Sequence, residues 1–124
     1  ELFVGELDGE VRGFAHAGPV RDPEPGLGVG LGVGLGEVYG FYADPMAWGT
    51  GLADLMMAAA VEHLVEGGFE RAVLWVLRDN PRARRFYERA GWALTGRTDE
   101  WPGPQLPSYT SPPVAEVEYG RPLR

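Results

Sequence analysis

The chain has 124 residues, of which 44% are hydrophobic, so it can build one ordinary hydrophobic core. It carries 11 basic and 18 acidic residues, a net charge of −7. This balance argues against a nucleic-acid partner, because phosphate contacts need clustered positive charge. The absence of cysteine excludes disulfides, thiolate metal sites and a cysteine nucleophile, and the presence of only two histidines argues against a zinc site. No apolar run is long enough to cross a bilayer, so we expect a cytoplasmic protein with no membrane partner.

All 11 basic residues are arginine. Without lysine, the chain can have neither a Gly-Lys-Ser/Thr phosphate loop nor Schiff-base chemistry. The sequence begins at Glu1 rather than at methionine, which is expected of a fragment, of a processed chain, or of a chain whose upstream residues are missing.

The first residues predict a β-hairpin over residues 2–16, because hydrophobic positions flank Asp8-Gly9, a strong two-residue turn signal. Strand character is expected to reach Val20, where the proline-rich stretch 21–25 ends it. Residues 26–36 then alternate glycine with leucine or valine. A dinucleotide-binding loop would need glycine at position 33, where valine stands. We therefore interpret this segment as a flexible loop or a weak strand extension.

The middle of the chain predicts a strand, a helix and a second strand. The first strand covers residues 37–43 and ends at Asp44-Pro45, and residues 48–53 lead directly into the helix. Gly67-Gly68 is expected to end this helix. Its predicted buried face consists of Leu52, Leu55, Met56, Ala59, His63 and Leu64. Residues 71–77 are nearly all apolar, as expected of a central strand.

The last third predicts a second helix and two further strands. Asn80-Pro81 supplies an N-cap followed by proline at the first helical position, and Gly91 is expected to end the helix. Its shared face consists of Ala83, Phe86, Tyr87 and Ala90. Strands are expected over 92–97 and 114–119, with a long proline-rich loop over 99–113. The order β-β-β-α-β-α-β-β predicts a mixed α/β sheet without an internal domain boundary.

Two segments could carry chemistry. The glycine turn at 49–53 lies between a strand and a helix, where exposed N–H groups favour an anion such as pyrophosphate. A plain strand-to-helix turn has the same pattern, because short glycine motifs are common. Six of the 11 arginines fall between residues 78 and 97. They could contact a phosphate-bearing cofactor, or form a solvated helix face that pairs with Glu88.

Together, these segments resemble the Gcn5-related N-acetyltransferase (GNAT) family. Members carry Gln/Arg-x-x-Gly-x-Gly/Ala at the start of a helix, which corresponds here to Trp48–Ala53, with Trp48 in place of the glutamine or arginine. The family's second motif is matched by Asn80, Ala83, Phe86, Tyr87, Gly91 and Trp92. Order and spacing match from about residue 2 to the C-terminus, which implies one acetyltransferase domain over 1–124. The strand and the one or two helices with which members begin, and which help to shape the acceptor pocket, are not visible before Glu1.

The resemblance implies a mostly antiparallel sheet with a splayed central pair of parallel strands, 37–43 and 71–77, flanked by helices. Acetyl-CoA would bind where these strands separate, with its pantetheine arm on the first strand and its pyrophosphate on the amides of 49–53. The implied cofactor-binding residues are Phe41, Tyr42, Ala43, Trp48, Gly49, Thr50, Gly51, Leu52, Ala53, Asn80, Ala83 and Phe86.

The implied activity is the transfer of an acetyl group from acetyl-CoA to a primary amine of a small molecule or peptide, by direct attack of the amine. Tyr87 is implied as the acid beside the CoA sulfur, since a phenol pKa of about 10 exceeds a thiol pKa of about 8.5; a core aromatic beside Phe86 is the structural alternative. Glu37 is the candidate base, with a pKa that burial could raise; a solvent-facing glutamate is its alternative. Weaker candidates for the base are Asp22, Tyr39 and His16. His63 is expected to be a packed helix residue.

A second hypothesis is a non-catalytic acyl-CoA-binding or sensor domain, which would keep the 49–53 turn but lack a working base. The net charge of −7 mildly favours a cationic acceptor. Members of the family often dimerise, so the resemblance also implies a homodimer, although no residue specifies how it would form.

Overall fold

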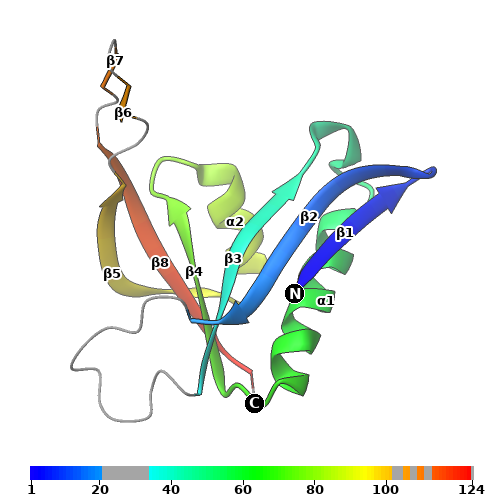
Figure 1. Ribbon diagram of the computed structural model, residues 1–124, viewed down its shortest axis with the longest axis horizontal. Helices are drawn as coiled ribbons and strands as arrows, with labels where there is room; N and C mark the ends of the chain where they lie inside the picture. Colours follow the sequence, from blue (N-terminus) through cyan, green and yellow to red (C-terminus); the bar gives the residue numbers. More distant parts are fainter. Residues whose placement is uncertain (21–33, 102–104, 107–108, 111–112, 124) are drawn as a thin grey trace. The chain divides into compact units, whose positions relative to one another are not determined.

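The computed structural model describes residues 1–20, 34–101, 105–106, 109–110 and 113–123. Six strands form one sheet in the order β1-β2-β3-β4-β8-β5, and β6 pairs with β7 (Figure 1). The elements are β1 (Leu2–Leu7), β2 (Glu10–Pro19), β3 (Leu35–Ala43), the 3-10 helix η1 (Pro45–Ala47), α1 (Leu52–Glu66), β4 (Arg71–Leu77), α2 (Pro81–Arg89), β5 (Ala93–Trp101), β6 (Gln105–Leu106), β7 (Tyr109–Thr110) and β8 (Val114–Pro122). The predicted mixed, mostly antiparallel sheet with a parallel pair, β3 and β4, is confirmed in the described part of the chain.

The chain divides into two compact units. The first unit contains Glu1–Leu74 and Arg121–Arg124, and the second contains Trp75–Gly120. Strand β4 begins in the first unit and ends in the second. None of the helices within the described ranges is both long and apolar enough to cross a bilayer.

The first unit begins with the predicted hairpin. Asp8 and Gly9 have φ values of 54° and 80°, which is the geometry of a two-residue turn that matches the right-handed twist of the strands. Where β2 pairs with β3, Gly40 lies opposite His16 and Val38 lies opposite Ala17, so β3 contains one extra residue. This β-bulge bends β3 halfway along its length. The register of β3 with β4 pairs Leu35–Val38 with Arg71–Leu74, within the first unit.

Helix α1 packs against β1 and β2, behind which it lies in Figure 1. A Cβ atom at Gly5 would lie 2.7 Å from Met56 Sδ, and one at Gly13 would lie 2.8 Å from Met56 Cε. Glycine at these two positions therefore allows the helix to approach the strands closely. The residues of α1 that this approach buries are Leu52, Met56, Met57, Ala60 and Leu64.

The predicted buried face of α1 wrongly includes one residue and omits two, and the predicted Ala59 and His63 are half-buried. Leu55 is 70% exposed, and Met57 and Ala60 are buried instead. Apolar residues lie around most of α1, so their spacing could not show which face of the helix packs against the glycines of β1 and β2. His63 packs edge-on against Phe3 with ring centroids 5.6 Å apart, as expected of a packed helix residue.

In the second unit, the Asn80 side chain caps α2 as predicted, accepting a hydrogen bond of 3.2 Å from the Ala83 N–H. Gly91 follows the helix with φ of 97°, which confirms the predicted stop.

The predicted loop over 99–113 is wrong at its start, because β5 continues to Trp101. Asp99–Trp101 pair in register with Val114–Glu116. Cross-strand pairing thus outweighs the low strand propensity of the charged residues. The short strands β6 and β7 also lie in this stretch.

Residues 26–33 of the glycine-rich segment lie outside the described residues, as does the stretch 21–25 with Asp22. At the C-terminal end of the segment, Leu35 and Gly36 belong to β3, so this part is a strand extension. Gly36 is buried, and a Cβ atom there would lie 2.8 Å from Leu64 Cδ2.

Candidate functional site

The turn between η1 and α1 is built on two glycines in the left-handed region. Gly49 has φ of 82°, and Gly51, the N-cap of α1, has φ of 87°. A Cβ atom at either position would have no neighbour within 4 Å among the described residues. Glycine is therefore required here by the backbone conformation and not by crowding, and the space beside the turn is open.

The amides of this turn divide into two groups. The N–H of Thr50 donates to the Ala47 carbonyl oxygen at 3.2 Å, and the N–H of Leu52 donates to Thr50 Oγ1 at 3.3 Å. Within the described part of the chain, no acceptor is found for the N–H groups of Gly49 and Gly51. The N–H of Ala53 belongs to the first helical turn, which has no intrahelical acceptor. Of the five amides of the predicted 49–53 segment, the three alternate ones of Gly49, Gly51 and Ala53 could therefore donate to a ligand.

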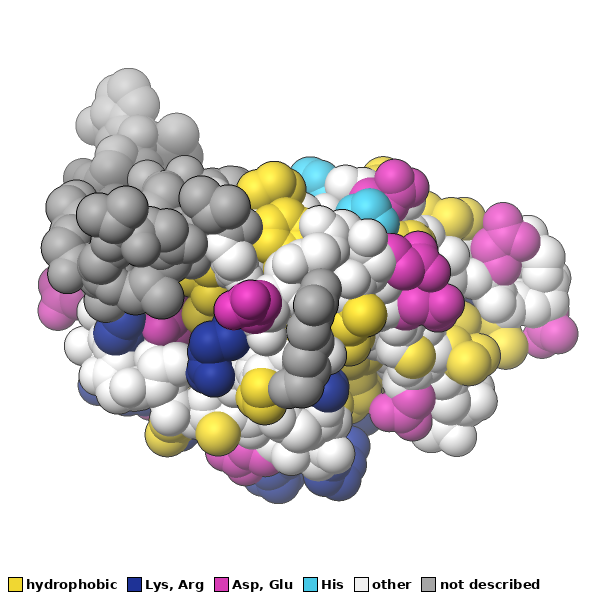
Figure 2. Space-filling model, turned by 90° about the horizontal axis from the view of Figure 1, so that it is seen from below, with side chains coloured by type: hydrophobic (Ala, Val, Ile, Leu, Met, Phe, Trp, Pro, Cys, Tyr) yellow, Lys and Arg dark blue, Asp and Glu magenta, His cyan; other side chains and the backbone are white. Residues whose placement is uncertain are grey.

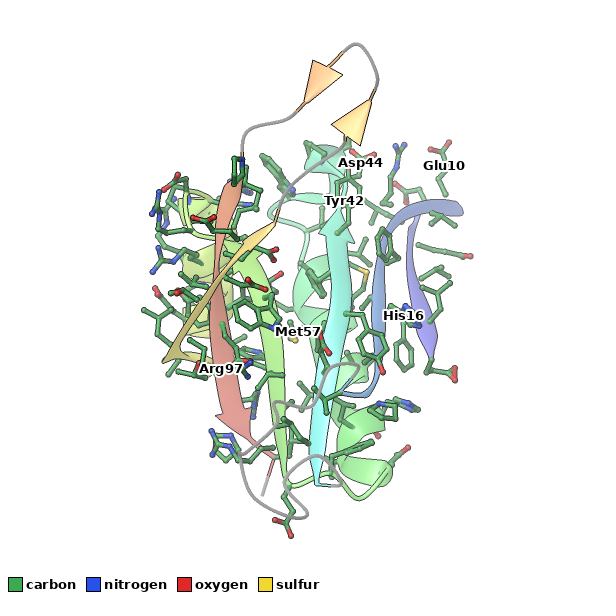
Figure 3. All side chains as sticks on the ribbon, turned by 60° about the vertical axis from the view of Figure 1, so that its left-hand side comes forward. Glu10, His16, Tyr42, Asp44, Met57 and Arg97 are labelled. Carbon is green, nitrogen blue, oxygen red and sulfur yellow. The ribbon has the colours of Figure 1, made fainter. Side chains whose placement is uncertain are left out.

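Trp48 connects this turn to the end of β3. Its indole Nε1 donates a hydrogen bond of 3.1 Å to the Ala43 carbonyl oxygen, while 47% of the residue stays exposed. The same strand end carries Tyr42 and Asp44, labelled in Figure 3. Asp44 accepts a hydrogen bond of 2.9 Å from the Met46 N–H, which starts η1. The first unit thus brings the predicted residues 41–43 and 48–53 together in one continuous segment.

Glu37 is a buried carboxylate on β3. The residue is only 5% exposed and lies opposite Gly18 on β2 and Val73 on β4. The alternative of a solvent-facing glutamate at the strand end is therefore wrong. Glu37 is the third residue of a strand that begins at Leu35, two positions before the predicted start, and this extension encloses it.

The weaker candidates for the base differ in their surroundings. The Tyr39 hydroxyl donates a hydrogen bond to the Pro19 carbonyl oxygen, and its ring meets His16 edge-on with centroids 4.9 Å apart. His16 is exposed, and histidine side chains appear in cyan on the face shown in Figure 2. The carbonyl of Pro19 holds the Tyr39 hydroxyl as a donor, so this phenol is less suited than Glu37 to accept a proton.

In the second unit, Tyr87 is the one buried residue of α2 and is 7% exposed. Its ring lies 5.6 Å from that of Phe86 and 6.2 Å from that of Tyr119, measured between centroids. Burial disfavours the charged phenolate and raises the pKa of Tyr87 to about 12. At neutral pH the group is therefore a proton donor, although the same burial would also suit a purely structural aromatic.

The other predicted residues of the second unit lie on the same helix. Asn80 uses its Oδ1 atom for the cap of α2, so a side-chain contact with a ligand would fall to its NH₂ group. Ala83 and Phe86 are half-buried. The second unit thus presents Asn80, Ala83, Phe86 and Tyr87 within three helical turns.

Several of the arginines are held by partners within the second unit. Arg84 Nε donates to the Tyr119 hydroxyl at 2.9 Å, and Arg84 Nη1 donates to the Arg78 carbonyl oxygen at 2.9 Å. Arg78 itself pairs with Asp79 at 3.2 Å. The carboxylate of Glu88 accepts a hydrogen bond of 2.7 Å from the Tyr119 hydroxyl. The arginine-rich stretch is thus in part a structural network.

A buried polar cluster surrounds Glu118, which the sequence did not predict. Glu118 is 2% exposed, accepts a hydrogen bond of 2.7 Å from Thr95 Oγ1, and pairs with Arg97 Nη1 at 2.9 Å. The Arg97 guanidinium also lies 5.5 Å from the centroid of the Trp75 ring. The alternating pattern of 114–119 indicated a strand but could not show that its glutamate would be enclosed.

Comparisons with known proteins agree with this arrangement. A model of the acetyltransferase (GNAT) family matches residues 1–92. A mycothiol acetyltransferase of Amycolatopsis mediterranei is 38% identical over 91 residues, which cover 73% of this chain and 29% of the relative. An N-acetyltransferase of Archaeoglobus fulgidus, described as uncharacterised, is 34% identical over 86 residues, which cover 69% of this chain and 55% of the relative. This chain therefore spans about half or less of the length of these relatives.

Solved structures show the same fold. Nourseothricin acetyltransferase superposes with a TM-score of 0.75 at 22% identity, covering 99% of this chain and 65% of that one. An acetyltransferase of Salmonella typhimurium, solved with its cofactor acetyl-CoA, also gives a TM-score of 0.75, at 18% identity, covering 99% and 64%. The family uses acetyl-CoA as its acyl donor. The family model, which matches most of the chain, and the shared fold lead to one conclusion: this chain belongs to the GNAT acetyltransferase family.

Proposed function

We propose that this chain is an acetyl-CoA-dependent N-acetyltransferase domain that acetylates a primary amine of a small molecule or peptide. The observation that carries the proposal is the turn before α1, where Gly49 and Gly51 hold left-handed conformations next to open space. Such a turn is suited to a diphosphate, because backbone N–H donors and the positive end of the helix dipole act on the same anion.

In the proposed complex, the pyrophosphate of acetyl-CoA accepts hydrogen bonds from the N–H groups of Gly49, Gly51 and Ala53. The pantetheine arm lies along the C-terminal part of β3, beyond Val38. Backbone groups of residues 41–43 would pair with its amides. The remaining proposed contacts with the cofactor come from Trp48, Thr50, Leu52, Asn80, Ala83 and Phe86.

Transfer requires a neutral amine, which attacks the thioester carbonyl carbon; a C–N bond forms and the C–S bond breaks. We assign the proton that the amine loses to the carboxylate of Glu37, directly or through water. The support for this role is that Glu37 is enclosed on β3, the strand on which we place the cofactor. The leaving thiolate then takes up a proton, either from Glu37 or from solvent.

We propose that Tyr87 acts on the departing sulfur. Its pKa of about 12 keeps the phenol protonated throughout the neutral range. A thiol has a pKa of about 8.5, so complete proton transfer from this phenol would cost roughly 5 kcal/mol. Tyr87 would therefore stabilise the developing thiolate by donating a hydrogen bond more than by giving up its proton.

The acceptor class is tested with a panel of amines. Several relatives are named mycothiol acetyltransferases, so the panel should include amines related to mycothiol beside simple cationic amines and peptide N-termini. Release of thiol from acetyl-CoA reports turnover, and the shift of the thermal unfolding midpoint reports binding of the cofactor. We expect both signals. Binding without turnover for every amine would favour a non-catalytic acyl-CoA sensor, and the absence of binding would contradict both functions.

A further inference from the structure

We infer that Tyr119 is a positioning residue that fixes the rotation of α2, and hence the place of the Tyr87 hydroxyl. The inference rests on the proposed function, because it concerns the group assigned to the departing sulfur. Tyr119 lies on β8 and its exposed fraction is 0%. No role of this residue follows from the two sequence motifs, which end before β8.

The hydroxyl of Tyr119 joins two consecutive turns of α2. It accepts a hydrogen bond of 2.9 Å from Arg84 Nε and donates one of 2.7 Å to Glu88 Oε2. Residues four apart on a helix lie on the same face, so one oxygen atom from β8 holds both turns at once. Tyr87 directly precedes Glu88, and its ring is tilted by 51° against that of Tyr119 at 6.2 Å. The hydroxyl therefore fixes the stretch of helix that carries Tyr87.

The rotation of α2 about its axis depends strongly on these hydrogen bonds, because few apolar side chains of the helix are buried. It has nine residues, and Tyr87 is the only buried one among them. Besides Tyr87, only half-buried side chains such as Ala83 and Phe86 contribute apolar area that opposes a rotation of the helix about its axis. Hydrogen bonds to charged groups are stronger than those between neutral groups and resist such a rotation. Arg84 adds a third bond of 2.9 Å to the Arg78 carbonyl oxygen, just before the helix.

The hydroxyl can act as donor and acceptor at the same time because Tyr119 stays neutral. Burial raises its pKa, while Arg84 lowers it and Glu88 raises it. An error of about 1 Å in the position of a reacting group can lower a rate by about 100-fold. The hydrogen bonds of the Tyr119 hydroxyl with Arg84 and Glu88 should therefore affect the rate of acetyl transfer as well as the stability of the chain.

The test is a double-mutant cycle on the rate of acetyl transfer, using the amine from the panel that reacts fastest. Tyr119→Phe keeps the ring and removes only the hydroxyl. We expect it to lower kcat about tenfold while the KM for acetyl-CoA changes less than twofold. If Tyr119 acts through Tyr87, the same change should have no further effect on kcat in a Tyr87→Phe background.

Three further variants check the mechanism of this effect. Glu88→Gln keeps an acceptor for the Tyr119 hydroxyl and should retain kcat within about twofold. Glu88→Ala removes one of the two bonds of this hydroxyl and should lower kcat by more than Glu88→Gln, but by no more than Tyr119→Phe. Thr95→Val removes a different hydroxyl that is bonded to a β8 side chain, Glu118, and should lower the unfolding midpoint without lowering kcat.

The outcomes separate the inference from the function on which it rests. If Tyr87→Phe lowers kcat but Tyr119→Phe does not, the positioning role is wrong and the role of Tyr87 stands. Equal losses for Tyr119→Phe in the wild-type and Tyr87→Phe backgrounds would also overturn it, since they would show a structural effect independent of Tyr87. If Tyr87→Phe leaves kcat unchanged, both roles are wrong.

Discussion

The indole Nε1 of Trp48 donates a hydrogen bond of 3.1 Å to the carbonyl oxygen of Ala43. This bond ties the glycine turn before α1 to the end of β3, the two features to which we assign acetyl-CoA. The family holds glutamine or arginine at this position, so Trp48 replaces a polar side chain with an aromatic one that is anchored to the backbone. Its role would be to hold the turn in place and not to contact phosphate.

Trp48→Phe tests this role because it keeps an aromatic ring and removes the N–H donor together with part of the indole. The loss of one hydrogen bond should lower the free energy of unfolding by about 1 kcal/mol. If the bond also sets the turn, the Kd for CoA should rise by roughly fivefold, which corresponds to the same free energy. Urea unfolding and isothermal titration calorimetry measure the two effects, and an unchanged Kd would show that the turn holds its shape without Trp48.

The two ends of α1 provide a matched pair of variants. Gly51 and Gly68 have φ values of 87° and 85°, and an added Cβ atom would meet no atom within 4 Å at either one. Alanine in this conformation costs about 1–2 kcal/mol, so both substitutions should destabilise the chain to a similar extent. Only Gly51→Ala should also weaken CoA binding, by about tenfold or more, because Gly51 belongs to the proposed diphosphate site. If both variants have the same Kd for CoA, the turn is not part of the proposed diphosphate site.

Tyr87 should give the stability of the chain a dependence on alkaline pH. Its pKa in the folded state, about 12, is above the unfolded value of about 10, so the unfolded state loses its proton first as the pH rises. The stabilisation is fully present below pH 10 and is lost between about pH 10 and 12, with a total of up to about 3 kcal/mol. Urea unfolding between pH 8 and 11.5 measures it. In Tyr87→Phe the decline should be smaller, and an equal decline would contradict the assigned pKa.

Glu118 should matter for stability although it is not assigned to catalysis. It is buried with Arg97 and Thr95 as its partners. Glu118→Ala leaves Arg97 without its carboxylate and should lower the free energy of unfolding by about 3 kcal/mol. Glu100→Ala, an exposed carboxylate on the neighbouring strand β5, is the control and should change it by less than about 0.5 kcal/mol. Similar losses in both variants would indicate that the Glu118 cluster adds no specific stabilisation.

Local signals explain why much of the fold could be predicted. Asp8-Gly9, Asn80-Pro81 and Gly91 each specify a backbone conformation on their own, and the structure confirms all three. The orientation of α1 could not be predicted, because it depends on Gly5 and Gly13 lying beneath Met56, a contact between distant segments. The extension of β5 to Trp101 depends in the same way on its pairing with β8.

The candidate site was predictable to the extent that it consists of backbone conformation. The predicted glycine turn is present, with positive φ at Gly49 and Gly51. That the Thr50 amide donates to the Ala47 carbonyl and the Leu52 amide to the Thr50 hydroxyl could not be read from the spacing of residues. The burial of Glu37 and Glu118 likewise depends on neighbouring strands.

The central claim is that the turn before α1 holds the diphosphate of acetyl-CoA. A crystal structure of the chain with bound CoA tests it most directly. We predict pyrophosphate oxygens within hydrogen-bond distance of the N–H groups of Gly49, Gly51 and Ala53. A diphosphate bound elsewhere on the chain, with this turn open to solvent, would contradict the account.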